Sequence, residues 1–176
     1  MALERWKPRH DGYCAAQICE NGHVITTRAL RADDLRPFCS QCGRETFVKC
    51  RHCGETIRGD LPAGEEGAAT PPYVEPSYCP ACGRAYPWTE TRLETARGLA
   101  AELEGLSVRE QRQLLQSLDD LMADTPRASL AALQFERLIA RARGAGLRAL
   151  RDLVRDVTAR TREPVQSPPA VGGAPT

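Results

Sequence analysis

Eight cysteines, most of them in closely spaced pairs, constrain this chain of 176 residues more than any other feature. Three pairs share the pattern Cys-x-x-Cys-Gly, and they begin at Cys39, Cys50 and Cys79. Two thiolates three positions apart in a tight turn can bind one tetrahedral cation, while the glycine permits a backbone conformation that side chains disfavour. One such pair would also fit thiol redox chemistry. Three repeats, each ending in glycine, favour structural zinc.

The number of thiolates predicts a second, less regular site. The last two pairs complete one four-sulfur site, which leaves Cys39 and Cys42 in need of two upstream ligands. Cys14 with Cys19 is one candidate pair, and Cys19 with His23 is the other. We prefer the second, because an Asn-Gly turn lies between its two ligands and a predicted strand starts after the histidine. The predicted ligands of two zinc ions are therefore Cys19, His23, Cys39, Cys42, Cys50, Cys53, Cys79 and Cys82.

The spacing between the pairs also predicts their order. Only residues 43–49 separate the second pair of one site from the first pair of the next, and they have the composition of one strand. We therefore predict tandem zinc ribbons rather than a cross-braced arrangement. Zinc binding is worth about 10–16 kcal/mol in small finger peptides, so this part should unfold without metal. Full sets of protein ligands leave no open coordination position, so we predict no catalytic residues and no enzyme activity.

A change in composition predicts the domain organisation. All the cysteines lie between residues 14 and 82, whereas the sequence after Trp88 is rich in Leu, Ala, Arg and Glu. We predict a tandem zinc-ribbon domain over 1–88, a helical domain over 89–163 and a disordered tail over 164–176. Short strands are predicted at 23–27, 45–49, 55–58 and 85–88, with an exposed loop over 59–76 because this segment is rich in Gly and Pro.

Helix signals divide the second part into four amphipathic segments. Thr89 is a candidate N-cap for a helix to about residue 104, and Ser107 with Glu110 has the spacing of a capping box. Thr125-Pro126 predicts the start of a third helix, and the fourth spans about 147–162. Short connections favour a compact antiparallel bundle of these four helices.

Charge and hydropathy limit the functions that are compatible with the chain. Its formal net charge is +1, which argues against strong global attraction to nucleic acid or to an anionic membrane. No apolar run reaches the ~18 residues of a membrane span, and the charged N-terminus lacks the apolar stretch of a secretion signal. We therefore expect a cytoplasmic protein, in which reduced cysteines favour metal over disulfides.

Arginines in the last part form the second notable pattern. Eight arginines against three acidic residues give 136–162 a charge of +5. Arg148, Arg151 and Arg155 recur at helical spacing, so nucleic acid is a possible partner through this face. Because no aromatic residues are interleaved for base stacking, we favour a solvated polar face.

Several strings resemble a known bacterial family. They are Ala16-Gln-Ile-Cys-Glu-Asn-Gly-His-Val-Ile25, Phe38-Cys-Ser-Gln-Cys-Gly43 and Tyr78-Cys-Pro-Ala-Cys-Gly-Arg-Ala-Tyr-Pro-Trp-Thr89. They are similar to a family classified as a domain of unknown function, with an N-terminal double zinc ribbon, and the resemblance covers about residues 13–160. It implies ligands at Cys19 and at the Cys-x-x-Cys pairs, and its Asn-Gly-His string favours His23. Cys14 is not part of that family pattern.

These observations predict a zinc-binding, non-enzymatic adaptor that contacts a protein partner, in an unknown biological process. One alternative is a nucleic-acid-binding zinc-ribbon protein. A second alternative is a redox-switched thiol chaperone, which would require accessible thiols with low pKa values.

Overall fold

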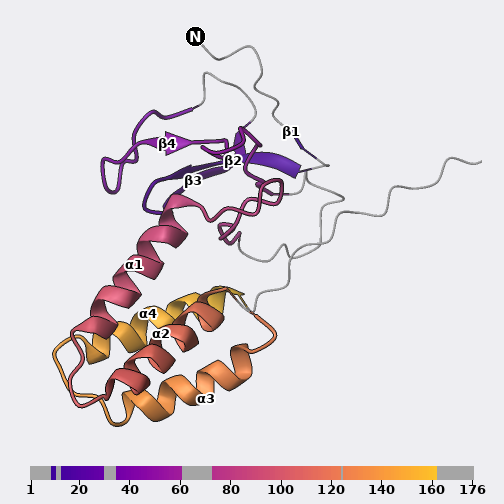
Figure 1. Cartoon of the computed structure of the whole chain (residues 1–176). Helices are drawn as coiled ribbons and strands as arrows, with labels where there is room; N and C mark the ends of the chain where they lie inside the picture. Colours follow the sequence, from indigo (N-terminus) through magenta and orange to yellow (C-terminus); the bar gives the residue numbers. More distant parts are fainter. Residues whose placement is uncertain (1–8, 11–12, 30–34, 61–72, 124, 162–176) are drawn as a thin grey trace, which may run out of the picture. The chain divides into compact units, whose positions relative to one another are not determined.

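The computed structural model describes residues 9–10, 13–29, 35–60, 73–123 and 125–161. The chain divides into two compact units, one containing the residues up to Trp88 and the other beginning at Thr89. The first holds the strands and the cysteines, and the second consists of helices (Figure 1). The predicted fold class, a small β region with metal-binding cysteine clusters followed by a helical region, is confirmed.

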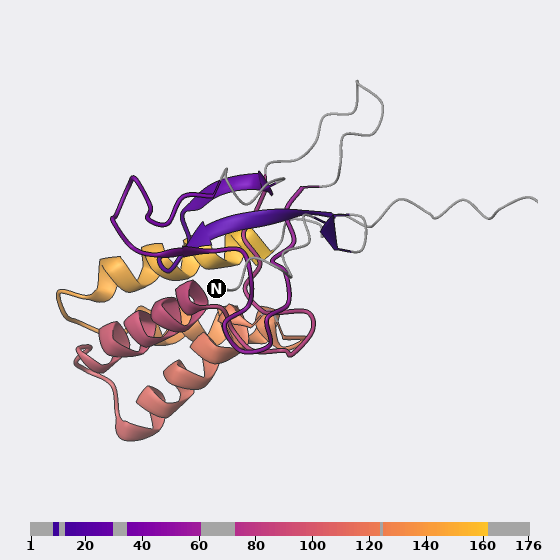
Figure 2. The ribbon, with the colours of Figure 1, turned by 90° about the horizontal axis from the view of Figure 1, so that it is seen from above.

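The sheet of the first unit is built around one central strand. Its strands are β1 (Arg9–His10), β2 (Tyr13–Cys19), β3 (Val24–Ala29) and β4 (Thr46–Phe47). β1, β3 and β4 all pair with β2 in the antiparallel direction. β2 and β3 are the two long neighbouring strands in Figure 2. β2 therefore positions both the hairpin to β3 and the later segments of the unit.

The β2 strand was not predicted from the sequence. Every residue of this strand is buried, so it lacks the alternation of polar and apolar residues that marks a half-exposed strand. Its two alanines have a low strand propensity, which hides it further.

The predicted short strands need correction. The strand expected at 23–27 is β3 and extends to Ala29, whereas only Thr46–Phe47 of 45–49 belongs to a named strand. Residues 55–58 contribute isolated bridges rather than a strand. The strand predicted at 85–88 is wrong, because α1 already begins at Pro87, where a residue without an N–H fits the first helical turn. The predicted loop over 59–76 starts too early, because Gly59 is buried and donates its N–H to the Cys14 carbonyl; residues 61–72 of this loop and the predicted tail lie outside the described residues.

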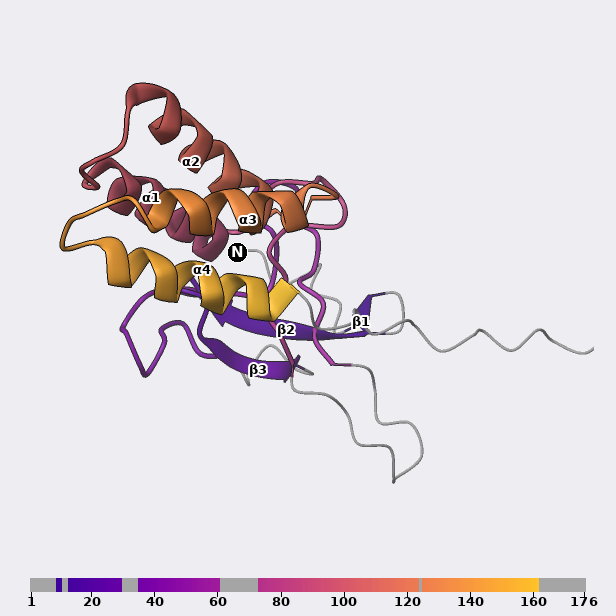
Figure 3. The same cartoon turned by 90° about the horizontal axis from the view of Figure 1, so that it is seen from below.

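The described residues after this sheet form four helices: α1 (Pro87–Ala101), α2 (Val108–Met122), α3 (Ala128–Ile139) and α4 (Leu147–Thr161). Leu114, Phe135 and Leu150 are buried in the apolar core that the helices share. Figure 3 shows the helices that contribute to this core. None of the described helices combines the length and the apolar character that a bilayer crossing requires.

The helix starts were predicted with mixed success. The capping box of Ser107 and Glu110 is confirmed at the start of α2. Thr89 is not an N-cap, because α1 begins two residues earlier and buries it. The start predicted at Thr125-Pro126 is also wrong, because α3 begins only at Ala128. The Thr125 carbonyl accepts from the N–H of Ala128 at 2.8 Å, which closes a turn before the helix.

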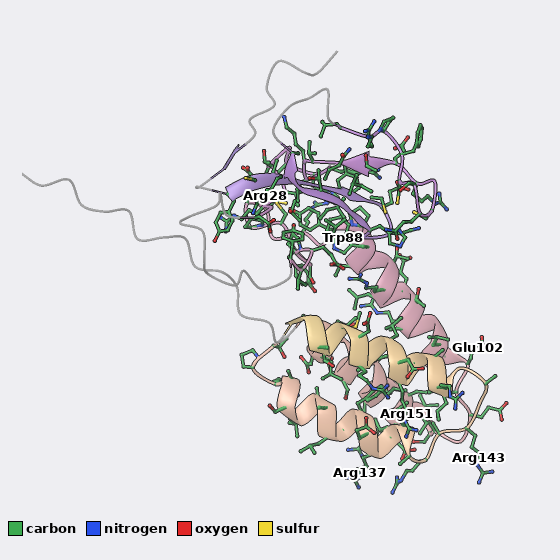
Figure 4. The ribbon with its side chains drawn as sticks, turned by 180° about the vertical axis from the view of Figure 1, so that it is seen from behind. Arg28, Trp88, Glu102, Arg137, Arg143 and Arg151 are labelled. Carbon is green, nitrogen blue, oxygen red and sulfur yellow. The ribbon has the colours of Figure 1, made fainter. Side chains whose placement is uncertain are left out.

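The core of the first unit is small and contains two cysteines. Ile18 from β2, Ile57 and Trp88 are fully buried, and Cys50 and Cys79 belong to the same cluster. Trp88, labelled in Figure 4, also donates its indole N–H to the Pro76 carbonyl at 2.9 Å. Two of the candidate metal ligands therefore also belong to the core.

Candidate metal centres

The first centre brings together the end of β2, the start of β3 and the turn after them. Its four ligand atoms belong to Cys19, His23, Cys39 and Cys42 and lie within 4.8 Å of one another. The Sγ atoms of Cys19 and Cys42 are 3.8 Å apart. His23 Nδ1 is 3.3 Å from Cys42 Sγ and 3.6 Å from Cys39 Sγ. These separations fit the edges of a tetrahedron around an ion with metal–sulfur bonds of about 2.3 Å, whose sulfur–sulfur edge is about 3.8 Å and sulfur–nitrogen edge about 3.6 Å.

The second centre consists of four sulfurs from two turns. The Sγ atoms of Cys50 and Cys82 are 3.8 Å apart, and those of Cys53 and Cys79 are 3.6 Å apart. All four lie within 4.8 Å of one another, again as in a tetrahedral site. Cys50 and Cys79 are buried, whereas Cys53 and Cys82 are exposed. One side of this centre therefore faces the core and the other faces solvent.

The three Cys-x-x-Cys-Gly segments adopt the same backbone turn. In each, the glycine N–H donates to the carbonyl of the first cysteine at 2.8–2.9 Å. The glycines have φ values between 69° and 75°, in the left-handed region. A Cβ added to any of them would meet nothing within 4 Å, so there is space for a side chain. Glycine is favoured at these positions because of the backbone angle alone. The glycines concerned are Gly43, Gly54 and Gly83.

Two of these turns also favour the ionised form of their first thiol. Burial alone would raise the pKa of Cys39, but the backbone N–H groups of Gln41 and Cys42, with the Cys42 and His23 side chains, lower it to about 6. Cys79 shows the same balance: burial opposes ionisation, yet the N–H groups of Cys82 and Ala81 and neighbouring thiols lower its pKa to about 7. A stabilised thiolate is the form that binds a metal ion.

The structure separates Cys14 from both centres. Residues 13–19 form an extended strand, so Cys14 and Cys19 are separated by about 16 Å along it. The Cys14 side chain is buried within this strand and belongs to neither group of ligand atoms. The group that contains Cys19 includes His23 instead, through the turn that Gly22 closes by donating its N–H to the Cys19 carbonyl at 2.9 Å.

The two groups follow one another along the chain. The first uses residues 19–42 and the second residues 50–82, which is the tandem order. Each group offers four protein ligand atoms, which fill a tetrahedral coordination shell. The arrangement can therefore hold two metal ions and stabilise the surrounding loops.

Arg51 connects the two centres. This role of Arg51 was not predicted from the sequence. It lies in the turn between Cys50 and Cys53, and its guanidinium pairs with Glu20, next to Cys19, at 2.8 Å. It also lies 3.5 Å from Glu45 and over the Phe47 ring, 4.7 Å from the centroid. An exposed arginine inside a Cys-x-x-Cys turn is an ordinary sequence feature, so only the tertiary structure reveals this contact.

The arginines named as a possible nucleic-acid contact lie on α4. Arg155 pairs with Asp152 at 3.3 Å, and Arg151 is only half-exposed. Arg148 is exposed. Outside α4, Arg137 and Arg143 are labelled in Figure 4, where Arg143 projects away from the helices. Part of the positive charge on α4 is therefore balanced within the helix.

Comparison with known proteins gives one family match. No curated protein and no solved structure matches the chain significantly. A family model described as uncharacterized protein conserved in bacteria (DUF2321) matches residues 12–165, a span that contains both metal centres and all four helices. This match confirms the resemblance seen in the sequence, and the chain therefore belongs to the bacterial protein family DUF2321.

Proposed function

We propose that the chain is a zinc-binding adaptor, whose metal ions shape a surface that contacts another protein. The observation that carries this proposal is the pair of complete donor sets, each with its ligand atoms within 4.8 Å. Thiolate and imidazole ligands in a tetrahedral arrangement favour zinc over the hard cations that prefer oxygen. Because four protein ligands occupy each coordination shell, we propose a structural role and no catalysis at either centre.

The proposed protein contact uses two aromatic side chains in equivalent positions. Phe38 and Tyr78 each immediately precede the first cysteine of a turn, and one belongs to each centre. Phe38 is 59% exposed and Tyr78 36% exposed. Large exposed aromatic groups are typical anchors in protein interfaces. We propose the cytoplasm as the compartment, where reducing conditions keep the thiols available for metal.

The metal content tests the first part of the proposal. Elemental analysis of the purified full chain should find two zinc ions per molecule. Replacing Cys39 by Ser should remove one ion, replacing Cys79 by Ser the other, and each loss should leave the remaining ion bound. A chain with fewer than two tightly bound ions would contradict the proposal.

Protein capture tests the second part. The zinc-loaded chain, immobilised and exposed to a bacterial lysate, should retain a defined protein that the double variant Phe38→Ala, Tyr78→Ala loses. A matched control, Leu130→Ala with Leu133→Ala, removes two other exposed apolar side chains, which are 50% and 72% exposed on α3. Equal retention by both double variants would contradict a contact at the aromatic pair. A nucleic-acid role would instead give binding to DNA or RNA that weakens steeply with salt.

A further inference from the structure

The hydroxyl group of Tyr86 is buried beside the second metal centre. Its side chain is 1% exposed, and its ring stacks on Trp88 with the centroids 4.7 Å apart. Among the described residues, this hydroxyl makes no hydrogen bond of ordinary geometry. Tyr73, which packs against the same core, donates its own hydroxyl to the Arg58 carbonyl at 2.6 Å. Because a buried hydroxyl without a hydrogen bond destabilises the folded state, Tyr86 requires an acceptor.

Two predicted ligands of the second centre share the core of Tyr86. Cys50 and Cys79 belong to the same buried cluster as Tyr86. Of the two, Cys79 is the one whose side chain lies within hydrogen-bonding reach of the Tyr86 hydroxyl. A phenol hydroxyl can donate a hydrogen bond to such a sulfur. A metal-bound thiolate is negatively charged, which makes it a stronger acceptor than a thiol.

The charge of the second centre explains why it needs such a donor. Four thiolates around one divalent cation carry a net charge of about −2. Water can solvate the exposed sulfurs of Cys53 and Cys82, but the buried sulfurs of Cys50 and Cys79 depend on donors from the protein. At Cys79 the backbone N–H groups of Cys82 and Ala81 supply part of this donation.

The equivalent positions of the other turns offer no comparable donor. Tyr86 is the fourth residue after the second cysteine of its turn, and the corresponding residues of the other two are Thr46 and Ile57. Ile57 has no polar group. The Thr46 hydroxyl is already used, because it donates to the Arg36 carbonyl and accepts from Gln17. Tyr86 is thus distinctive among the three turns.

We propose that the Tyr86 hydroxyl donates a hydrogen bond to the Cys79 thiolate when the second centre holds its metal ion. In this role Tyr86 is a positioning residue, which withdraws negative charge from the sulfur, orients it and slows metal loss. The inference rests on the proposed metal binding and adds to it a specific source of stability for the second centre.

Cadmium NMR of the full chain tests this inference, because a site with four sulfurs and a site with three sulfurs and one nitrogen give separate resonances. Tyr86→Phe should shift the four-sulfur resonance and weaken metal binding there by about tenfold, with the other resonance unchanged. Tyr73→Phe, which removes a hydroxyl that already has a backbone acceptor, is the matched control and should leave both resonances in place. In the unmodified chain, the Tyr86 hydroxyl proton should show scalar coupling to the cadmium of the four-sulfur site.

The possible outcomes separate this inference from the proposed function. If the chain takes up no cadmium and no zinc, the proposed function fails. If two ions bind but the four-sulfur resonance and affinity of Tyr86→Phe match those of the unmodified chain, the inference alone is overturned. If Tyr86→Phe does not fold, the coupling in the unmodified chain decides: its absence overturns the hydrogen bond, and its presence establishes it.

Discussion

At the scale of single residues, Gly59 shows how little space the first unit leaves around its central strand. Its N–H donates to the Cys14 carbonyl at 2.7 Å. A Cβ at this position would lie 2.0 Å from the Thr27 carbonyl oxygen and 3.0 Å from the Ala15 carbonyl carbon. Both obstacles are backbone atoms, which cannot turn aside as a flexible side chain can.

We therefore expect Gly59→Ala to lower the free energy of unfolding of the first unit by about 3 kcal/mol, the upper part of the usual cost of overpacking. Denaturant unfolding at saturating zinc, followed by tryptophan fluorescence, measures this. Gly98→Ala is the control of opposite sign: Gly98 lies within α1 with nothing within 4 Å of an added Cβ. This variant should stabilise the helix by about 0.5–1 kcal/mol. Equal effects of the two substitutions would contradict this explanation.

The role of His23 is open to a similar substitution test. Its Nδ1 atom lies 3.3 Å and 3.6 Å from two sulfurs of the first centre. His23→Ala should lower zinc affinity at that centre by more than about a hundredfold, because it removes a direct ligand, whereas His23→Cys should keep four ligands and bind. Competition with a chromogenic chelator measures both affinities. Cys14→Ala, the control, should retain both ions; loss of an ion from it would restore the four-sulfur alternative.

The residues of the two centres could be named from the sequence because a turn with two ligands is local chemistry. The spacing of a Cys-x-x-Cys-Gly segment fixes the turn, and the Asn-Gly between Cys19 and His23 predicts another. Tyr86 and Arg51 could not be assigned in this way. Arg51 contacts Glu20, which lies about 30 residues away in the sequence. The contacts of Tyr86 depend on which face of its turn is buried. No local pattern contains that information.

At the scale of elements, the start of α2 carries the clearest single contribution to helix stability. The Ser107 hydroxyl accepts from the Glu110 N–H at 3.3 Å, and the Glu110 carboxylate accepts from the Ser107 N–H at 2.9 Å. The carboxylate also pairs with Arg141, beyond the end of α3, at 2.9 Å. These contacts, those of Ser107 first and that of Arg141 next, lower the pKa of Glu110.

Ser107→Ala should therefore cost about 1 kcal/mol of stability in the helical unit.

Glu110→Gln should lower the melting temperature at pH 7. Because the pKa of Glu110 is lower in the folded state, its charge stabilises the fold above the unfolded pKa of about 4.3, and this stabilisation is lost as pH falls through the folded value. The melting temperatures of Glu110→Gln and of the unmodified chain, measured by circular dichroism from pH 7 to pH 3, should converge at the acidic end. A difference that persists unchanged at pH 3 would contradict the assignment.

The elements that were missed share a physical reason. β2 is buried on both faces, so burial removes the alternation that would identify it. Residues 85–88 have the aromatic content of a strand, yet Pro87 begins α1, because the packing of Tyr86 and Trp88 outweighs strand propensity. The helices after Gly105 were easier to predict, since their apolar spacing and the capping box are local signals.

At the scale of the whole molecule, the two units are stabilised by different means. The core of the helical unit consists of Leu, Ala, Phe, Ile and Val side chains from all four helices. The core of the first unit is smaller and includes the ligands Cys50 and Cys79. Metal removal should therefore act on one unit only.

Exhaustive chelation of the full chain should abolish the protection of backbone amides in β2 and β3 and retain it in α2, α3 and α4. Without an ion, the thiolates of each centre repel one another and the loops between them lose their closure, so the apolar core of the first unit is too small to compensate. Hydrogen exchange with mass spectrometry measures both units in one sample. Protection that survives in β2 and β3 after complete metal removal would show that the sheet folds by its own packing.

Exposure also predicts the order in which the two centres react with an oxidant. Cys53 and Cys82 of the second centre are exposed, whereas the three cysteines of the first are buried or half-buried. With hydrogen peroxide, two thiolates and two protons give one disulfide and two molecules of water, and the sulfurs no longer hold their metal ion. The Sγ atoms of Cys53 and Cys79, 3.6 Å apart, are placed for this reaction after a small movement.

We expect peroxide to release one metal ion per chain well before the other, with the first disulfide mapped by mass spectrometry to the second centre. Replacing Cys39 by Ser supplies the comparison, because it leaves the second centre as the main metal site and should leave the fast phase of metal release intact. Such selectivity would support the redox alternative, in which an accessible thiol is the sensor. Slow release of both ions together would instead mean that the buried sulfurs limit the reaction, and would leave the metal ions with a structural role alone.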